Sequence, residues 1–289
     1  MRETPPAPVP TAATRLFGLL GHPVSHSLSP AMHNAAFRAL GLDACYLAFD
    51  VPPERLVDAL RGARALGAGG LNVTVPHKEQ ALRLAEEVDE GAALVGAANT
   101  LVPTSGGWKA FNTDVEGFLR ALEEDVGFQA AGRKAVVLGA GGAARAAIVG
   151  LLRSGIQGIV VLNRNEERAE KLVSTVRRTV GGNRITSARL DPDEAPGLGP
   201  GDLVVSATPL GLQGDARWPW PLSTISAGVV FYDMAYGPGE TSLVNAARQE
   251  GFLAASGRRM LLHQGAAAFS LWTGQAAPML VMEEALRGQ

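Results

Sequence analysis

The sequence predicts an α/β fold with two domains, and three observations carry this prediction. The chain has 289 residues, which is long for one domain and comfortable for two. Short apolar runs alternate with helical segments along most of its length, as in α/β folds. Between residues 134 and 163, a strand pattern, a glycine-rich turn, a helix pattern and a second strand pattern follow one another directly. Together these observations favour two α/β domains.

The first 116 residues predict a domain in which strands and helices alternate. Apolar runs predict strands over 15–21, 44–50 and 70–74, and strands at 100–102 and 108–111 flank the turn 105–107 as a hairpin. Helices are expected from Pro30, with Ser29 as the N-cap, over 54–66 and over 77–87. Residues 1–13 are rich in Pro, Ala and Thr, and we expect them to form a disordered tail.

The rest of the chain predicts a second domain and a returning C-terminal segment. A helix over 115–124 leads into strands at 135–138 and 158–162, which a helix at 145–152 connects. Further strands are expected at 202–206, 229–233 and 253–255, and the stretch from Met260 is helical and apolar. We place the second domain at 117–257 and assign 258–289, together with 14–116, to the first.

The glycine-rich turn predicts a site for the pyrophosphate of a dinucleotide. Small residues let the backbone approach a phosphate closely, and the N–H groups at the start of the next helix are free to bind an anion. The residues predicted to bind the cofactor here are Gly139, Ala140, Gly141, Gly142 and Ala143.

The end of the second strand of this unit favours NADP over NAD. An NAD site usually has an acidic residue at this place, which binds the ribose 2′-hydroxyl. This chain has Asn163 and Arg164, with Arg168 one turn further on. An arginine suits a 2′-phosphate, which a carboxylate would repel. We therefore expect NADP(H) as the cofactor, bound in part by these three residues.

The composition excludes several classes of function. A net charge of −2 with both signs mixed argues against nucleic acid or an anionic membrane as the main partner. Cys45 is the only cysteine and no acidic cluster accompanies His22 and His26, so we predict no disulfide within the chain and no metal. The sequence has no segment of membrane-spanning length and no apolar signal-peptide stretch, so we expect a cytoplasmic protein.

Six motifs, in matching order and spacing, resemble those of the shikimate dehydrogenase family. They are Gly21–Pro30, Asn72–Lys78, Gly96–Thr100, Asn112–Asp114, Tyr232–Tyr236 and Gly257–Gln264. The resemblance runs from about residue 16 to the C-terminal helix. It implies a substrate-binding domain and a Rossmann-type NADP domain with a cleft between them. It also implies reduction of 3-dehydroshikimate to shikimate by NADPH, in the biosynthesis of chorismate and the aromatic amino acids.

The resemblance singles out Lys78 and Asp114 as the catalytic pair. Hydride transfer to a ketone must be accompanied by proton transfer to its oxygen, so a proton-transfer group must touch that oxygen. A carboxylate close to a lysine favours the protonated ammonium. We therefore expect Lys78 to be the acid in ketone reduction and the base in alcohol oxidation, with Asp114 keeping it protonated.

The resemblance also implies the residues that contact the substrate, which are Ser27, Ser29, Thr74, Asn99, Tyr236 and Gln264. The two serines match the place of the substrate carboxylate, and the threonine and the two amides match the groups that contact the ring hydroxyls. On the cofactor side, Thr208 follows a strand of the second domain, where ligands bind in such sheets. Gly257 opens the last motif and is assigned to the cofactor as well.

Several alternatives stay open at this point. A quinate/shikimate dehydrogenase of broader specificity more often favours NAD, and Arg164 argues against that. A folate-interconverting dehydrogenase would need a different substrate loop. A protein that binds NADPH as a sensor without catalysis is disfavoured by the presence of Lys78 and Asp114. The sequence does not distinguish a monomer from a homodimer.

Overall fold

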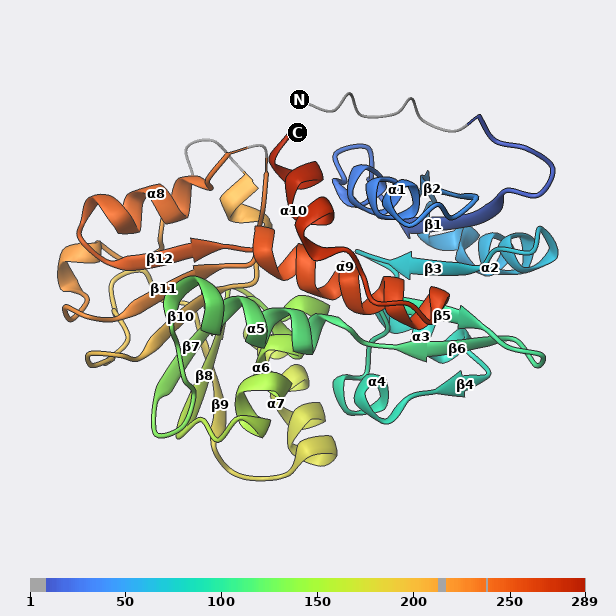
Figure 1. Ribbon diagram of the computed structural model, residues 1–289. Helices are drawn as coiled ribbons and strands as arrows, with labels where there is room; N and C mark the ends of the chain where they lie inside the picture. The colour runs from blue at the N-terminus through green and yellow to red at the C-terminus, as the bar shows by residue number, and fades with distance from the viewer. Residues whose placement is uncertain (1–8, 213–216, 238, 289) are drawn as a thin grey trace. The chain divides into compact units, whose positions relative to one another are not determined.

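The computed structural model describes residues 9–212, 217–237 and 239–288, and the chain divides into two compact units (Figure 1). Unit 1 contains the described residues up to Ala92, then Ala97–Thr113, and those from Gly265 onward. Unit 2 contains Ala93–Gly96 and Asp114–Gln264. These boundaries differ by a few residues from the predicted ones and assign Asp114 and Gln264 to unit 2. Residues 1–8 of the predicted tail lie outside the described part of the chain.

Unit 1 is built on a mixed sheet of six strands in the order β2-β1-β3-β5-β6-β4. The strands are β1 (Arg15–Gly21), β2 (Ala44–Asp50), β3 (Gly70–Val73), β4 (Glu87–Val88), β5 (Thr100–Pro103) and β6 (Trp108–Phe111). Strand β1 pairs in parallel with β2 and β3, whereas β5 pairs antiparallel with β3 and β6. The predicted hairpin is therefore confirmed.

The helices of unit 1 follow from the same alternation. They are α1 (Ser29–Ala39), α2 (Leu56–Ala65), α3 (Lys78–Leu84) and α10 (Met279–Arg287), with a 3-10 turn at Pro53–Arg55. Two further helices, α4 (Glu90–Val95) and α9 (Arg258–Thr273), contribute residues to both units.

Alternating side chains of the unit 1 strands build two cores. Leu20 of β1 and Leu71 of β3 pack with Leu56 of α2 in an aliphatic cluster. The neighbouring position Asn72 faces the other way and bonds to Tyr46, which belongs to an aromatic cluster. A side chain at Gly70 would collide with the ring of Trp272, so only glycine admits this indole.

Three helix boundaries predicted from the sequence are wrong. Ser29 is not the N-cap of α1: the helix begins at Ser29, and the hydroxyl of Ser27 accepts the Ser29 N–H (3.3 Å). The helix predicted over 77–87 ends at Leu84, because the Glu86 carboxylate accepts the Trp108 N–H (2.7 Å) and draws the next residues into β4. The C-terminal helical stretch is interrupted after Thr273 by Gly274, whose φ of +69° ends a helix readily.

Unit 2 contains a fully parallel sheet of six strands in the order β12-β11-β10-β7-β8-β9. The strands are β7 (Lys134–Leu138), β8 (Gly158–Asn163), β9 (Ile185–Arg189), β10 (Leu203–Ser206), β11 (Val230–Asp233) and β12 (Leu253–Ser256). This is the doubly wound order, in which the connections change direction between β7 and β10. The strands predicted for this domain are confirmed to within a residue or two.

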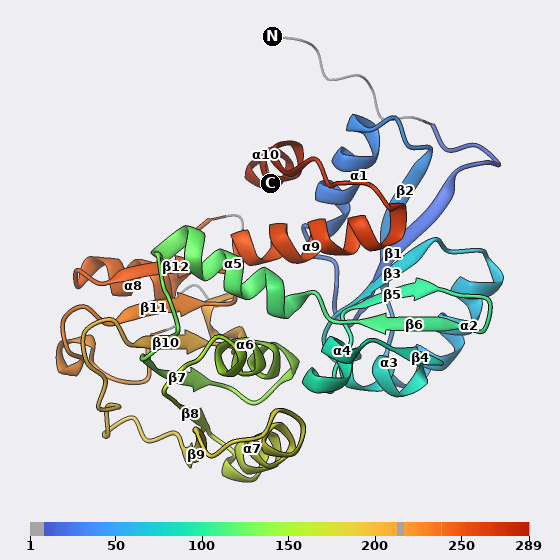
Figure 2. The ribbon, with the colours of Figure 1, turned by 60° about the horizontal axis from the view of Figure 1, so that its bottom comes forward.

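Helices cover both faces of the unit 2 sheet. They are α5 (Asp114–Val126), α6 (Gly142–Arg153), α7 (Glu166–Val180) and α8 (Ser242–Gln249). The sheet has one core on each face, and alternate residues of β7 point into them. Val137 packs with α5, α6 and α7 on one face (Figure 2). Val136 packs with α8, Trp218 and Trp220 on the other face. Such burial on both faces explains why the central strands β7 and β10 are continuous apolar runs.

Within the described residues, no helix is both long and apolar enough to span a membrane.

Candidate active site

In unit 1, two loops at one edge of the sheet carry several predicted substrate residues. Strands β1 and β3 run in parallel and end at this edge. The loop after β1 carries Ser27 and leads into α1 at Ser29, and Thr74 directly follows β3. The His22 N–H donates to the Val75 carbonyl oxygen (3.0 Å), which ties one loop to the other.

The two serines lie at the start of α1. Ser29 is buried in the first turn and Ser27 is half-buried immediately before it. The N-cap residue, Leu28, has no side chain that can cap this helix, and no acidic residue lies in its first turn. A helix N-terminus favours a negative charge, and hydroxyl groups there can donate to it. The local chemistry therefore suits a carboxylate ligand.

A backbone hydrogen bond brings Lys78 and Asn99 to the same edge. The Ala98 N–H donates to the Lys78 carbonyl oxygen (2.8 Å). The Val73 N–H, at the end of β3, donates to the Asn99 carbonyl oxygen (2.8 Å). Lys78 is the first residue of α3 and is half-buried. Lys78 and Asn99, which are distant in sequence, therefore lie at the same edge of the unit 1 sheet.

The side chain of Asn99 is held by Thr113. Its Oδ1 accepts the Thr113 N–H (2.8 Å), and its Nδ2 donates to the Thr113 hydroxyl (2.9 Å). Both residues are buried. Thr113 directly precedes Asp114, so the residue before the predicted catalytic carboxylate has a defined position in unit 1.

This contact continues into a buried network that the sequence analysis does not predict. The Tyr46 hydroxyl donates to Asn72 Oδ1 (2.7 Å), and Asn72 Nδ2 donates to the Thr100 hydroxyl (3.2 Å). Thr100 in turn donates to Asn99 Oδ1 (3.1 Å). Buried polar groups that satisfy one another specify a single arrangement. Asn72 lies in a motif quoted above, whereas nothing distinguishes Tyr46 from an ordinary core residue in the sequence.

In unit 2, the glycine-rich turn lies where the sheet reverses its strand order. Gly139 follows β7 and has a φ of +106°, and a Cβ there would lie 2.9 Å from the Ala207 carbonyl oxygen. The turn after β10 carries Thr208, whose methyl group would lie 3.2 Å from the same Cβ. Only glycine fits between these segments. The predicted residues Gly139 and Thr208 are therefore neighbours at the carboxyl edge of the sheet, where such folds bind ligands.

The start of α6 has the features of an anion site. Ala140, Gly141, Gly142 and Ala143 are half-buried, and among the described residues, chain neighbours aside, no atom lies within 4 Å of a Cβ built on Gly141. The helix has no side-chain cap and no acidic residue in its first turn. Its first N–H groups therefore remain available to a phosphate.

Two arginines lie beyond the adjacent strand. Asn163 ends β8, and its Nδ2 donates to the Asn165 carbonyl oxygen (2.8 Å). Asn165 then caps α7 by accepting the Arg168 N–H (3.0 Å). Arg164 and Arg168 are both exposed. These bonds fix the backbone of the segment that carries the two exposed arginines.

The other predicted residues of unit 2 lie on three elements. Asp114 is the buried first residue of α5, and Gln264 lies on α9, where its Nε2 donates to the Leu261 carbonyl oxygen (2.9 Å). Tyr236 follows β11 and is half-buried. A Cβ on Gly257 would lie 2.2 Å from the Met234 carbonyl oxygen, so this glycine permits a close contact between two backbone segments. Lys78 belongs to unit 1 and Asp114 to unit 2.

Asp233 is a buried carboxyl group beside the cofactor-side turns, and sequence reasoning assigns it no role. Its Oδ1 accepts the Ala235 N–H (3.3 Å), whereas Oδ2 is buried without a hydrogen bond of normal geometry from any described residue. Burial raises the pKa of Asp233 to about 6, and the Thr241 and Ser206 hydroxyls limit the rise. The signal available in the sequence is its place inside the motif Tyr232–Tyr236.

No group of three or more His, Cys, Asp or Glu side chains that could hold a metal ion occurs in the described ranges.

Comparison with known proteins identifies the family. Residues 19–101 match the shikimate dehydrogenase substrate binding domain, residues 121–208 match shikimate/quinate 5-dehydrogenase, and residues 257–287 match the shikimate 5′-dehydrogenase C-terminal domain. A shikimate dehydrogenase (NADP(+)) of Methanopyrus kandleri is 50% identical over 279 residues, which cover 95% of this chain and 96% of that protein. This chain belongs to the shikimate dehydrogenase family.

Other members of the shikimate dehydrogenase family agree. The shikimate dehydrogenase (NADP(+)) of Symbiobacterium thermophilum is 46% identical over 94% of this chain and 93% of its own length. A crystal structure of a shikimate dehydrogenase in complex with NADP+ is similar with a TM-score of 0.88 and 36% identity, covering 98% of each chain. The Thermus thermophilus enzyme in complex with NADP(H) and shikimate has a TM-score of 0.82 and 37% identity, covering 95% of this chain and 99% of that one. The predicted fold class, a substrate-binding α/β domain with a Rossmann-type domain, is confirmed.

Proposed function

We propose that this chain catalyses the NADPH-dependent reduction of 3-dehydroshikimate to shikimate, and the reverse oxidation. The observation that carries the proposal is the 50% identity, over 95% of the chain, to an NADP-dependent shikimate dehydrogenase. In a cell the reaction would serve chorismate and aromatic amino-acid biosynthesis. The chain is accordingly an oxidoreductase that acts on a CH–OH group.

The residues of unit 2 fit NADP(H). The uncapped start of α6 and the open space above Gly141 suit the pyrophosphate, which has negative charge and needs close backbone approach. Arg164 and Arg168 suit the 2′-phosphate, with Asn163 shaping their loop. Thr208 and Gly257 complete the predicted set. When bound, the reduced nicotinamide supplies the hydride.

We assign the proton transfer to Lys78. Its ammonium group holds the proton at Nζ and donates it to the substrate oxygen during reduction, and the neutral amine takes it back during oxidation. We assign Asp114 the role of acidic partner of this lysine, as the resemblance to the family implies. Burial of Asp114 supports this assignment, because a buried carboxylate needs a positive or donating partner.

We assign substrate recognition to the polar residues that the resemblance implies. Ser27 and Ser29 receive the carboxylate, since their hydroxyls lie at the N-terminal end of α1. Thr74, Asn99 and Gln264 bind ring hydroxyls. Tyr236 contributes a further hydroxyl from the segment after β11. A site with several polar groups discriminates strongly against an analogue that leaves one of them unpaired.

The decisive experiment is Lys78→Ala. Loss of a positioned proton donor lowers turnover by roughly 10²- to 10⁴-fold, while the dissociation constant of NADP+ stays unchanged. The matched control is Lys109→Ala, which removes another half-buried lysine of unit 1 that packs over the Phe111 ring. Near-normal turnover of Lys78→Ala would remove this lysine from the mechanism.

A matrix of two substrates and two cofactors tests the reaction itself. Shikimate and quinate are each assayed with NADP+ and NAD+. We expect the highest kcat/KM for shikimate with NADP+. Equal use of quinate and NAD+ would favour the broader quinate/shikimate enzyme, and no turnover with any combination would favour an NADPH sensor. We further propose a cytoplasmic enzyme that is a monomer or homodimer, as expected from the sequence.

A further inference from the structure

Helices α5 and α9 make an unusually close contact within unit 2. A Cβ built on Gly117 of α5 would lie 2.9 Å from both the Cβ and the backbone N of Gln264 on α9, and 3.0 Å from the Met260 carbonyl oxygen. Two of these three atoms are backbone atoms, which cannot rotate away as a flexible side chain can. The spacing of the two helices at Gln264 therefore depends on the absence of a side chain at 117.

This contact lies beside two residues of the proposed site. Gly117 is three residues after Asp114 on α5, and residues at that spacing lie on the same face of a helix. Gln264 is itself the residue in contact. The approach of the helices thus sets the spacing between the backbones that carry the proposed carboxylate and one of the proposed substrate amides.

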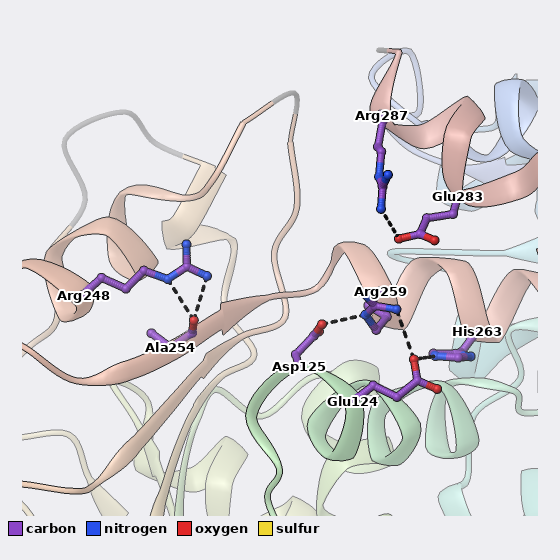
Figure 3. A network of polar contacts seen from close by, with 8 residues as sticks. All are labelled: Glu124, Asp125, Arg248, Ala254, Arg259, His263, Glu283 and Arg287. Atoms are coloured by element: carbon purple, nitrogen blue, oxygen red, sulfur yellow. Dashed lines mark hydrogen bonds and ion pairs between the residues drawn. The ribbon is translucent and has the colours of Figure 1, made fainter. Parts of the chain in front are cut away.

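A cluster of charged residues fastens the same two helices further along. Arg259 of α9 donates to Asp125 Oδ1 (2.6 Å) and Glu124 Oε2 (3.1 Å) of α5, and His263 Nε2 lies 2.9 Å from the same Glu124 oxygen (Figure 3). Glu124 is two turns beyond Gly117, and His263 directly precedes Gln264. The side chain of His263 is only 5% exposed, whereas that of Glu124 is 44% exposed, so this bond is part-buried.

The charges of this cluster act on one another. Burial pushes the pKa of Glu124 upward, but the hydrogen bonds and charges of His263 and Arg259 outweigh it and leave the pKa below its usual value. Asp125 is more buried, and desolvation raises its pKa despite the contact with Arg259. The ionised Glu124 is therefore the group that bonds both α9 side chains at neutral pH.

We propose that Gly117 and the His263–Glu124 pair are positioning residues for the reaction, holding α9 against α5 so that Gln264 keeps its place relative to Asp114. None of the three residues needs to touch the substrate. The inference rests on the proposed function, because it concerns how that site is assembled. It assigns a role to three positions outside the catalytic and substrate-binding set given above.

The first test is Gly117→Ala, with Gly150→Ala as the matched control. Gly150 is also a buried helical glycine of unit 2, but the atoms nearest to a Cβ there belong to the side chains of Leu119 and Val115, at 3.3–3.4 Å. A misplacement of about 1 Å can lower activity by roughly 100-fold, so we expect a fall of about that size in kcat/KM for shikimate with Gly117→Ala. The dissociation constant of NADP+ and the activity of Gly150→Ala should not change.

The second test compares His263→Ala with His263→Gln, and it stands even if Gly117→Ala does not fold. The glutamine Nε2 can donate to Glu124 where the histidine Nε2 does. Because one charge-assisted hydrogen bond is lost, we expect His263→Ala to raise KM for shikimate by about 10-fold, and His263→Gln to restore it. NADP+ binding should be equal in both variants.

These outcomes separate the two proposals. If the unaltered chain does not oxidise shikimate, the proposed function fails. If it does, but His263→Ala and His263→Gln behave alike, or NADP+ binding weakens as much as shikimate use, the contact is only structural and the positioning role is overturned.

Discussion

Replacing His33 with leucine should make the stability of the protein much less sensitive to acid. His33 lies on α1 in the aromatic core of unit 1, fully buried, with its ring stacked on Tyr46 at 4.5 Å between centroids. Neither ring nitrogen has a hydrogen-bond partner among the described residues. Burial without a partner disfavours the charged ring and lowers the pKa of His33 from 6.5 to about 3.

The size of the effect follows from this pKa. The unfolded chain takes up a proton at His33 as the pH falls through 6.5, whereas the folded chain does not until about pH 3. The free energy of unfolding therefore decreases with falling pH across this window. At 1.36 kcal/mol per unit, the whole shift corresponds to about 5 kcal/mol, of which about 3 kcal/mol is lost by pH 4. Leucine takes up no proton and contributes no such loss.

Urea unfolding at several pH values between 4 and 7.5 measures the effect. As the pH falls from 7.5 to 4, we expect His33→Leu to gain about 3 kcal/mol of unfolding free energy relative to the unaltered chain. At neutral pH we expect a smaller difference in unfolding free energy, because two effects oppose each other. The variant loses the stacking on Tyr46, about 0.5–1.5 kcal/mol, but it also removes two buried nitrogens that have no partner among the described residues. His26→Leu, at an exposed histidine, is the control. Identical pH profiles for His33→Leu and the unaltered chain would refute the reasoning.

Two further predictions concern unit 2. The folded-state pKa of Asp233, about 6, exceeds its ordinary value of 3.8, so its contribution to stability is lost as the pH rises between these values. As the pH rises from 4 to 7, the unfolding free energy of Asp233→Asn should therefore increase by about 2–3 kcal/mol relative to that of the unaltered chain. Urea unfolding measures this change. A difference that stays constant with pH would contradict the assigned burial. Arg164→Ala should raise KM for NADP+ by about 10- to 100-fold through loss of a charge-assisted contact, with NAD+ almost unaffected. The control is Arg178→Ala, near the end of α7, and a parallel loss with NAD+ would place Arg164 elsewhere than at the 2′-phosphate.

The strands that sequence reasoning predicts are those whose burial is visible in their composition. Strands β7, β10 and β11 of unit 2 are short apolar runs because both of their faces are covered. Strand β9 (Ile185–Arg189) is not predicted, since it lies at the sheet edge and only Ile185 is fully buried. Strand β4 is set by Glu86 reaching the Trp108 backbone, a tertiary contact that no local pattern contains.

The candidate site is predictable as a set of residues but not as a set of contacts. The family motifs supply Lys78, Asn99 and Asp114 together with their roles. The motifs do not show that Thr113 holds the amide of Asn99, or that Tyr46 supports the same network from another strand. Such partners are chosen by the pairing of strands distant in sequence, and a single sequence contains no record of that pairing.

The glycines illustrate why residue type alone cannot separate binding from packing. Gly139 and Gly257 both belong to motifs assigned to the cofactor, yet the space of each missing Cβ is occupied by a carbonyl oxygen, of Ala207 in one case and Met234 in the other. At Gly141 that space is open. The first two glycines therefore bring backbone segments of unit 2 together, and Gly141 is the one whose surroundings leave room for a phosphate. Gly117 likewise brings two backbone segments together, at a contact between helices instead of at a turn. Close backbone packing at Gly139 and Gly257 thus shapes the candidate site, and the open space at Gly141 leaves room for a ligand.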